Sequence, residues 1–294
     1  MLKSGIIDGI RCSTRPDAVG DEAISLLQSY GVNTVELGVQ SMNDGILVDA
    51  KRGHTAQEVV DAVARLKRRG MVVGVQLLPG LKGETWATIL ETAIAVVELK
   101  PDFVRIYPVL VIENTELADQ YRAGAYKPLS TEQAITYCAF LKEWFESHNI
   151  EVIRTGLQST DELDSGDSLL AGPYEPAMGE LVVNEQFKQR IERCFDEHFS
   201  ESALGDQYTY NFSPLSNHYS YKDKCRTHAN NTDRLMKHRI VISYPRSLTS
   251  KVRGLKNRNI LYFQEAYPQF NIEWCEDSTR NTVRCCIDGL QYVL

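Results

Sequence analysis

The stretch VVGVQLLPGLKGET (residues 72–85) predicts the fold of the first half of the chain. Its first seven residues are nearly all apolar, which is typical of a strand in a parallel sheet covered by helices. A Pro-Gly-Leu-Lys-Gly turn follows, and an amphipathic helix is expected from about Glu84 to Leu99. The stretch therefore forms one strand–loop–helix unit.

Three more units of the same kind lie on either side of it. Strands are expected at 5–12, 34–39 and 103–107, helices at 21–29, 55–69 and 131–148, and a last strand at 151–154. Strands that alternate with amphipathic helices are typical of parallel βαβ units, and ligands gather at the carboxyl ends of such strands. The sequence predicts an α/β domain over residues 1–155.

The pattern changes in the second half of the chain. Residues 156–180 are rich in Gly, Pro, Ser and acidic residues, which indicates a connection. Residues 181–294 are expected to form a small α+β module. Its elements are a helix at 184–198, a strand at 238–245, a helix at 248–267 and strands at 271–277 and 283–289.

Composition indicates a cytoplasmic protein with no membrane partner. Hydrophobic residues make up 43% and charged residues 24% of 294 residues, and no apolar run approaches the roughly 18 residues of a membrane helix. Asp8 and Arg11 interrupt the apolar N-terminus, so it is not expected to be a signal peptide. The seven cysteines have no disulfide-framework spacing. Cys225, His228 and His238 lack an evident fourth zinc ligand, so no metal site is predicted.

The charge is distributed unevenly. Residues 222–258 hold eleven Lys or Arg against two Asp, whereas the whole chain has a net charge of −7. This excess suits a polyanion, and nearby tyrosines favour RNA; a solvated charged face is the alternative. The candidate RNA-binding residues are Arg246, Lys251, Arg253, Lys256 and Arg258.

Four strand-end loops occur in a distinctive order. They are CSTRPD (12–17), VELGVQS (35–41) with KRGHT (51–55), LPGLKGET (78–85), and VRIYPV (104–109) with ENTEL (113–117). Together they resemble the later strands of radical S-adenosylmethionine (SAM) barrels, especially the Elongator catalytic subunit and its bacterial relatives. Oxygen-independent coproporphyrinogen oxidases are similar more loosely.

The resemblance implies a partial radical SAM (β/α) barrel that lacks its first strands. It also implies two cofactors, SAM and a [4Fe–4S] cluster, and radical chemistry on RNA, such as tRNA, or on a small organic substrate. The SAM-binding residues that it implies are Ser13, Arg15, Gln40, Ser41, Arg52, Gly80, Gly83 and Val109. No catalytic acid, base or nucleophile is identified, and a non-catalytic RNA-binding module or a decayed paralogue is the alternative function.

All of these positions except Ser13 also have a structural interpretation. Arg15 can pair with Asp17 or Asp21, and Arg52 can be a solvated charge. Gln40 and Ser41 can cap the turn that follows them, Gly80 and Gly83 can form an ordinary strand–helix turn, and Val109 can simply be buried. His54 is expected to be a hydrogen-bonding loop residue.

The cluster-binding loop of the family is absent from the sequence. Three cysteines spaced Cys-x3-Cys-x2-Cys hold three irons in such enzymes, but here Cys12 stands alone and the next cysteine is Cys138. The chain resembles the family from its third strand onward, so we expect an N-terminally truncated member that is inactive alone. A start site assigned too late, a split partner subunit and a decayed paralogue are the possible explanations, in that order.

Overall fold

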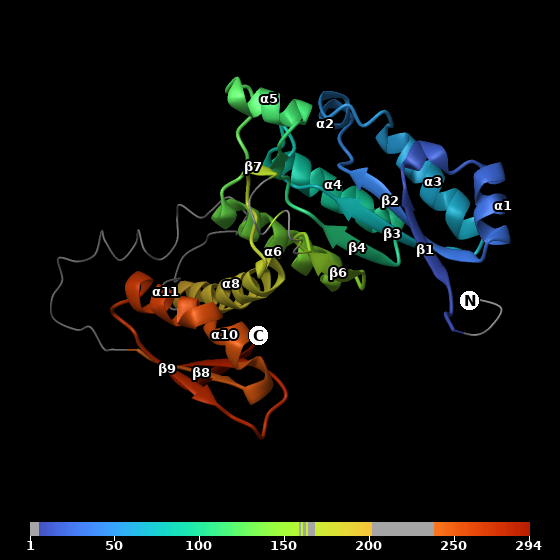
Figure 1. Ribbon diagram of the computed structural model, residues 1–294. Coiled ribbons are helices and arrows are strands. Elements are labelled where there is room, and N and C mark those ends of the chain that lie inside the picture. The colour runs from blue at the N-terminus through green and yellow to red at the C-terminus, as the bar shows by residue number, and fades with distance from the viewer. Residues whose placement is uncertain (1–5, 159, 161–162, 164–167, 202–237) are drawn as a thin grey trace. The chain divides into compact units, whose positions relative to one another are not determined.

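The computed structural model describes residues 6–158, 160, 163, 168–201 and 238–294 (Figure 1). The chain divides into two compact units, Met1–Val182 and Val183–Leu294. No helix among the described residues combines the length and the apolar character that a membrane span requires.

The first unit is built on a parallel sheet with the strand order β1-β2-β3-β4-β6. These strands are β1 (Ile10–Thr14), β2 (Val32–Gln40), β3 (Val72–Leu77), β4 (Phe103–Ile106) and β6 (Glu151–Thr155). The helices that connect them are α1 (Asp21–Ser29), α3 (Ala56–Arg68), α4 (Trp86–Leu99) and α6 (Thr131–Ser147). The α/β fold class and the parallel order of strands and helices are thus confirmed.

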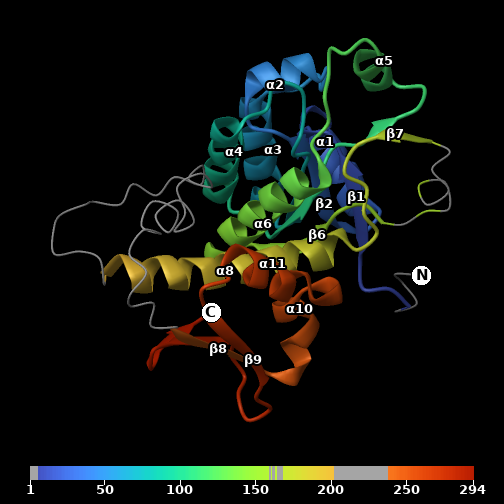
Figure 2. The same ribbon diagram turned by 90° about the vertical axis from the view of Figure 1, so that its left-hand side faces the viewer.

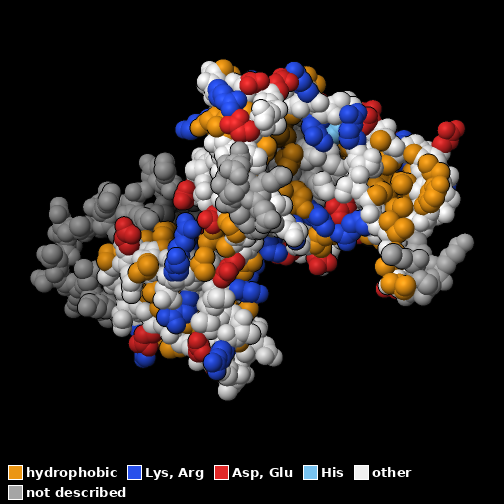
Figure 3. All heavy atoms as spheres, viewed as in Figure 1, with side chains coloured by type: hydrophobic (Ala, Val, Ile, Leu, Met, Phe, Trp, Pro, Cys, Tyr) orange, Lys and Arg blue, Asp and Glu red, His pale blue; other side chains and the backbone are white. Residues whose placement is uncertain are grey.

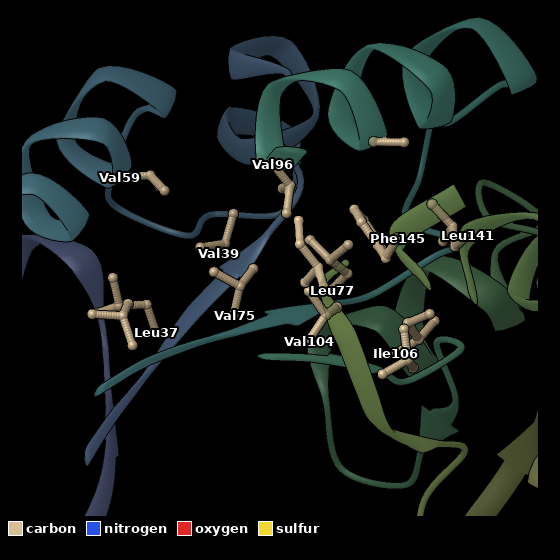
Figure 4. Close-up of a cluster of buried hydrophobic side chains, with 14 of the residues drawn as sticks. Leu37, Val39, Val59, Val75, Leu77, Val96, Val104, Ile106, Leu141 and Phe145 are labelled. Atoms are coloured by element: carbon tan, nitrogen blue, oxygen red, sulfur yellow. The ribbon is translucent and has the colours of Figure 1, made fainter. Parts of the chain in front are cut away.

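Alternating residues of each strand form the hydrophobic core of this unit. Leu37, Val75 and Val104 point to the helices and pack with residues such as Val59 and Phe145, all of them buried (Figure 4). Residues of the opposite parity lie on the other face of the sheet and are largely polar or glycine. Figure 2 shows the connecting helices gathered against one side of the strands.

Side-chain caps define where the connecting helices begin. Thr55 and Thr85 form capping boxes at the start of α3 and α4, and Ser130 does the same for α6. Each of these side chains accepts a hydrogen bond from a backbone N–H that the first helical turn leaves without a partner. The loops after β2, β3 and β4 are therefore held at both ends.

Smaller elements in the loops were not expected from the sequence. They are α2 (Asp44–Asp49), α5 (Glu116–Arg122) and an antiparallel pair, β5 (Val111–Ile112) with β7 (Leu169–Ala171). The strand expected at 5–12 is β1, which begins at Ile10 and runs to Thr14, because its pairing with β2 extends to Thr14 opposite Leu37.

The β1 side of the sheet exposes hydrophobic groups. β1 is an edge strand, and Leu26 and Tyr30 beside it are 60% and 71% exposed. Figure 3 shows hydrophobic side chains gathered over α1.

The second unit has a four-stranded sheet in the order β11-β10-β8-β9. Its strands are β8 (Arg239–Tyr244), β9 (Asn271–Glu276), β10 (Arg284–Ile287) and β11 (Leu290–Val293). Phe195 from α8 (Met178–Glu201) and Phe263 from α11 (Arg258–Ala266) are fully buried in its core. The last strand, β11, was not predicted.

Two expected helices in this region have different limits. The helix predicted at 184–198 is α8, which starts at Met178 because Met178 and Val182 are buried in the core of the first unit. The helix predicted at 248–267 is broken into α10 (Thr249–Arg253), one short 3-10 turn at Leu255–Asn257 and α11. Gly254 has a positive φ, and Lys256 and Asn257 are left-handed, which no continuous helix allows.

Gly74, in the central strand β3, lies directly under the ring of Phe103. A Cβ atom at Gly74 would come within 2.2 Å of two ring carbons. We expect Gly74→Ala to destabilise the protein by about 1–3 kcal/mol, because the buried Phe103 ring must shift to accept the methyl group. Gly20→Ala is the matched control, since nothing lies within 4 Å of its added Cβ. Thermal unfolding measures both, and equal melting temperatures would contradict the packing argument.

Candidate functional site

The carboxyl ends of β1 to β4 form one continuous edge. The Leu78 N–H donates to the Gln40 carbonyl at 3.0 Å, and the Val109 N–H donates to the Pro79 carbonyl at 3.0 Å. These bonds join the segment after β2 to that after β3, and the segment after β3 to that after β4. The loops singled out from the sequence therefore meet along this edge.

Arg15 and Arg52 approach each other at the β1–β2 end of this edge. An added Cβ at Gly53 would lie 3.3 Å from an Arg15 Nη atom, and one at Gly38 would lie 3.5 Å from an Arg52 Nη atom. Burial and the neighbouring Arg15 charge lower the pKa of Arg52. Two guanidinium groups beside two glycines form a positively charged niche that suits a small anion.

The two arginines differ in their acidic partners. Arg15 donates to Asp17 through Nε at 2.8 Å, and this bond lowers the pKa of Asp17. The ion pair is the structural role that the sequence left open for Arg15. Arg52 forms no ion pair with any residue that the structure describes, and its Nε is buried without a hydrogen-bond partner.

Gln40 and His54 complete the niche. Gln40 is 7% exposed and has a positive φ of 70°, so its side chain folds back over Gly38; its Oε1 is buried without a partner. His54 is buried, its Nε2 donates to the Val39 carbonyl at 3.2 Å, and its Nδ1 has no partner. Buried polar atoms are normally hydrogen-bonded, so these atoms indicate a place for a polar ligand or water.

Ser41 and Ser13 point elsewhere. Ser41 is fully buried, its Oγ accepts from the Asn43 N–H at 3.2 Å, and it lies 3.3 Å from the Thr92 hydroxyl of α4. It therefore caps the turn that follows it. Ser13 lies on the polar face of the sheet, where Gln76 Nε2 is 3.5 Å from its Oγ.

Gly80 and Val109 are neighbours at the β3–β4 end of the edge. Val109 Cβ lies 3.8 Å from the position of an added Cβ at Gly80. The polar groups of Gly80 are already engaged, because its N–H donates to Glu84 at 2.5 Å and its carbonyl accepts from the Tyr126 hydroxyl at 2.7 Å. Gly83 has a positive φ and open space around it, as in an ordinary strand–helix turn.

A cavity of about 220 Å³ adjoins this glycine loop. It is lined by Gly80, Leu81, Lys82, Gly83, Glu84, Ala125, Tyr126, Lys127, Leu129 and Tyr137. Burial raises the pKa of Glu84 to about 7, although the backbone N–H groups of Gly80 and Leu81 oppose the shift. Burial, together with the Glu84 charge, also raises the pKa of Tyr126 to about 12.

A buried carboxylate organises the polar face of the sheet. Glu36 is 1% exposed and lies between two arginines, with Arg11 at 2.9 Å and Arg105 at 3.4 Å from its Oε1. Gln76 donates to its other oxygen at 2.8 Å. These three partners compensate the cost of burying the Glu36 carboxylate. Because two arginines surround one carboxylate, the cluster carries a net positive charge on the polar face of the sheet.

Four residues were not predicted from the sequence as part of the site: Glu36, Arg105, Gln76 and Glu84. The alternation Thr34, Glu36, Gly38, Gln40 within an otherwise apolar strand is the signal that could have placed Glu36 on a polar face. Glu84 gave no such signal, because its burial depends on Tyr126 and Tyr137 from a distant part of the chain.

The candidate RNA-binding residues belong to the second unit. Arg246, Lys251, Lys256 and Arg258 are exposed, and Arg253 is partly buried. Residues 222–237, with Tyr219, Tyr221, Cys225 and His228, lie outside the described residues. His238 forms a 2.5 Å hydrogen bond with Asp288.

The cysteines do not form a metal site within the described residues. Those residues contain no group of three His, Cys, Asp or Glu side chains that could hold a metal ion, and their cysteines are free. The full sequence contains no Cys-x3-Cys-x2-Cys. These residues therefore do not fit an iron–sulfur cluster.

Comparisons with known protein families match two models in succession. Residues 3–95 match the radical SAM superfamily, and residues 101–189 match the radical SAM C-terminal domain. The second match includes the Gly-Pro-rich connection and the first part of α8.

Individual relatives are similar to part of this chain. The tRNA uridine(34) acetyltransferase of Methanocaldococcus jannaschii is 37% identical over 145 residues, which are 47% of this chain and 27% of that protein. Human Elongator complex protein 3 is 31% identical, over 45% of this chain and 24% of its own length. This chain thus spans about a quarter of the length of these relatives.

A solved structure supports the same relationship. The archaeal Methanocaldococcus infernus Elp3 with an N-terminal deletion of residues 1–46 superposes with a TM-score of 0.55 at 30% identity. The similarity covers 62% of this chain and 42% of that one.

The buried Glu84 carboxyl should make stability depend on pH. Because its folded pKa of about 7 exceeds the usual 4.5, protonation stabilises the fold; this contribution is complete below pH 4.5 and is lost as pH rises through 7. Glu84→Gln imitates the protonated group, so it should gain up to about 3 kcal/mol relative to wild type between pH 5 and pH 8.

Urea unfolding at both pH values measures this difference. Glu98→Gln, an exposed substitution near the end of α4, the helix that follows Glu84, is the matched control and should keep a constant offset from wild type. A constant offset for Glu84→Gln as well would disprove the raised pKa.

Proposed function

The chain belongs to the radical SAM superfamily, and we propose that the edge formed by the ends of β1 to β4 binds SAM. The observation that carries this proposal is the niche of Arg15 and Arg52 beside Gly38 and Gly53. In the niche, two guanidinium groups lie close to the backbone of two glycines. Arg52 Nε and Gln40 Oε1 are buried there without a hydrogen-bond partner.

The chemistry of the niche suits the methionyl end of SAM. Arg52 would pair with the carboxylate, since its guanidinium is half-buried and has no acidic partner among the described residues. Gln40 Oε1 would accept a hydrogen bond from the ammonium group or a ribose hydroxyl. Arg15, already paired with Asp17, would contribute charge at longer range.

The other end of the edge suits the adenine. Val109 would supply an apolar surface for a flat ring beside Gly80, whose own N–H and carbonyl are engaged by Glu84 and Tyr126. Glu84 and Tyr126 would act by fixing the Gly80 loop rather than by touching SAM.

The family implies a [4Fe–4S] cluster beside SAM, and the two together supply radical chemistry. Because the cysteines of this sequence do not provide the cluster ligands, no reaction step is assigned to them. We propose that the strand-end site forms the SAM-binding part of a radical SAM centre.

RNA is the proposed macromolecular substrate, and the cytoplasm the proposed location. Relatives are named tRNA uridine(34) acetyltransferase, and the family models match residues 3–95 and 101–189, which include all four strand-end loops. A non-catalytic RNA-binding role is the second candidate, which the exposed cations of the second unit favour.

SAM binding by the full chain tests the proposal. We expect weak binding, with a Kd of about 0.1–1 mM, and a loss of roughly tenfold or more for Arg52→Met, because a charge-assisted bond to a carboxylate contributes about 1.5–3 kcal/mol. Equilibrium dialysis with labelled SAM gives both values.

Arg68→Met is the matched control, since Arg68 is an exposed arginine near the C-terminal end of α3. It should leave the affinity unchanged. No binding by wild type at 5 mM SAM, or an equal loss in both variants, would overturn the proposed site.

A further inference from the structure

The segment Arg246–Arg258 is an unusual connection between β8 and α11, and here it is called the basic loop. Four of its cations, Arg246, Lys251, Lys256 and Arg258, are exposed. None of them forms an ion pair with an acidic residue that the structure describes. Basic and acidic side chains are interspersed on an ordinary protein surface, and this protein carries a net charge of −7 overall.

Two buried asparagines hold the basic loop in place. Asn184 and Asn259 are each 2% exposed. The Asn184 side chain donates to the carbonyls of Ser250 and Lys251, both at 3.1 Å, and accepts from the Leu255 N–H at 2.9 Å. One side chain therefore fixes both ends of the turn that carries Lys251.

Asn259 closes the arrangement from the other side. Its Nδ2 donates to the backbone carbonyl of Asn184 at 2.8 Å and to that of Val252 at 3.0 Å. The loop is thus bound to α8 through backbone groups on both sides of Gly254. Buried polar networks of this kind, with each member satisfied, specify a single conformation.

The conformation that they hold is costly. Lys256 and Asn257 are consecutive left-handed residues, with φ of 54° and 63°. Each such residue costs about 1 kcal/mol, so the surrounding bonds must compensate. Solubility alone does not require a fixed, strained backbone in a surface loop. The presentation of cations at fixed positions does require one.

We infer that the basic loop is a preformed binding surface for the phosphodiester backbone of RNA, with Asn184 and Asn259 as its positioning residues. The exposed cations supply the charge that phosphates require, and the clamped backbone reduces the entropy lost on binding. The described loop carries no exposed aromatic ring, so it would contact the backbone and not stack bases. The choice of RNA as the ligand rests on the proposed function. The positive charge of the loop and the clamp formed by Asn184 and Asn259 are independent of that function.

The test measures binding of the full chain to a fluorescein-labelled RNA hairpin by anisotropy between 50 and 300 mM NaCl. The double variant Lys251→Gln/Lys256→Gln should bind roughly tenfold more weakly at 100 mM, with the slope of log K against log salt reduced by about 1.5. The matched control is Arg239→Gln/Arg280→Gln, which removes two cations that are paired with Glu273 and Asp277 in the same unit. It should bind RNA as wild type does.

Asn184→Ala tests the clamp separately, because it keeps every charge. We expect a several-fold weaker affinity with the thermal unfolding of the protein still cooperative. If Asn184→Ala is unfolded, Asn184→Ser replaces it, since serine adds no charge and its one hydroxyl cannot replace the two donors and the acceptor of the asparagine. Wild-type affinity in the folded variant would show that the clamp does not position the cations.

Three results would overturn the inference. The first is that wild type does not bind RNA at 20 µM protein and 100 mM NaCl. The second is that both double variants weaken RNA binding equally. The third is that the protein prefers phosphatidylserine vesicles to RNA and that this preference depends on Lys251 and Lys256. SAM dialysis on the same double variant separates the two proposals. Failure of SAM binding removes the proposed function, whereas loss of RNA binding with SAM affinity intact concerns the basic loop alone.

Discussion

The pairing of β2 with both β1 and β3 is the constraint on which the first unit depends. Parallel pairing sets Val35, Leu37 and Val39 toward the helices and Glu36 toward the opposite face. The same register brings the end of β2 beside Thr14 and Leu78, so that Gln40 lies in the middle of the functional edge. Hydrophobic burial on one face therefore determines where polar groups gather on the other, because a strand alternates its side chains with a period of two.

Two charged groups of this unit, Glu36 and Arg52, are buried or half-buried, and they differ in whether an opposite charge compensates them. Glu36 is buried with Arg11, Arg105 and Gln76 around it, which meets the requirement for partners that burial imposes on a carboxylate. Arg52 is half-buried beside a second arginine and has no acidic partner in the part of the chain that the structure describes. The first arrangement stabilises the sheet face. The second is poised for an anion, which is why the proposed SAM site centres on Arg52 and not on Glu36.

In both units, buried polar side chains hold the backbone of a loop through hydrogen bonds, but the two loops have different proposed ligands. In the first, Glu84 and Tyr126 bind the backbone of Gly80 and so shape the loop after β3. In the second, Asn184 and Asn259 bind the backbone around Gly254 and so shape the basic loop. In both cases a buried polar side chain fixes a loop with positive φ angles, and the exposed groups of that loop are left for a ligand.

The sequence by itself determined the order of strands and helices, since apolar runs, capping residues and glycines are local signals. Together with the resemblance to radical SAM barrels, it placed Arg15, Gln40 and Arg52 among eight candidate residues, and the ends of parallel strands were expected to meet at one edge. Only the tertiary structure decided that Ser41 caps a turn, that Glu84 is buried and that Glu36 joins two arginines. Those outcomes depend on residues such as Thr92, Tyr126 and Arg105, each more than forty positions away in the chain. The broken helix at Gly254 has the same origin, because Asn184 stabilises a backbone that the helical pattern alone does not predict.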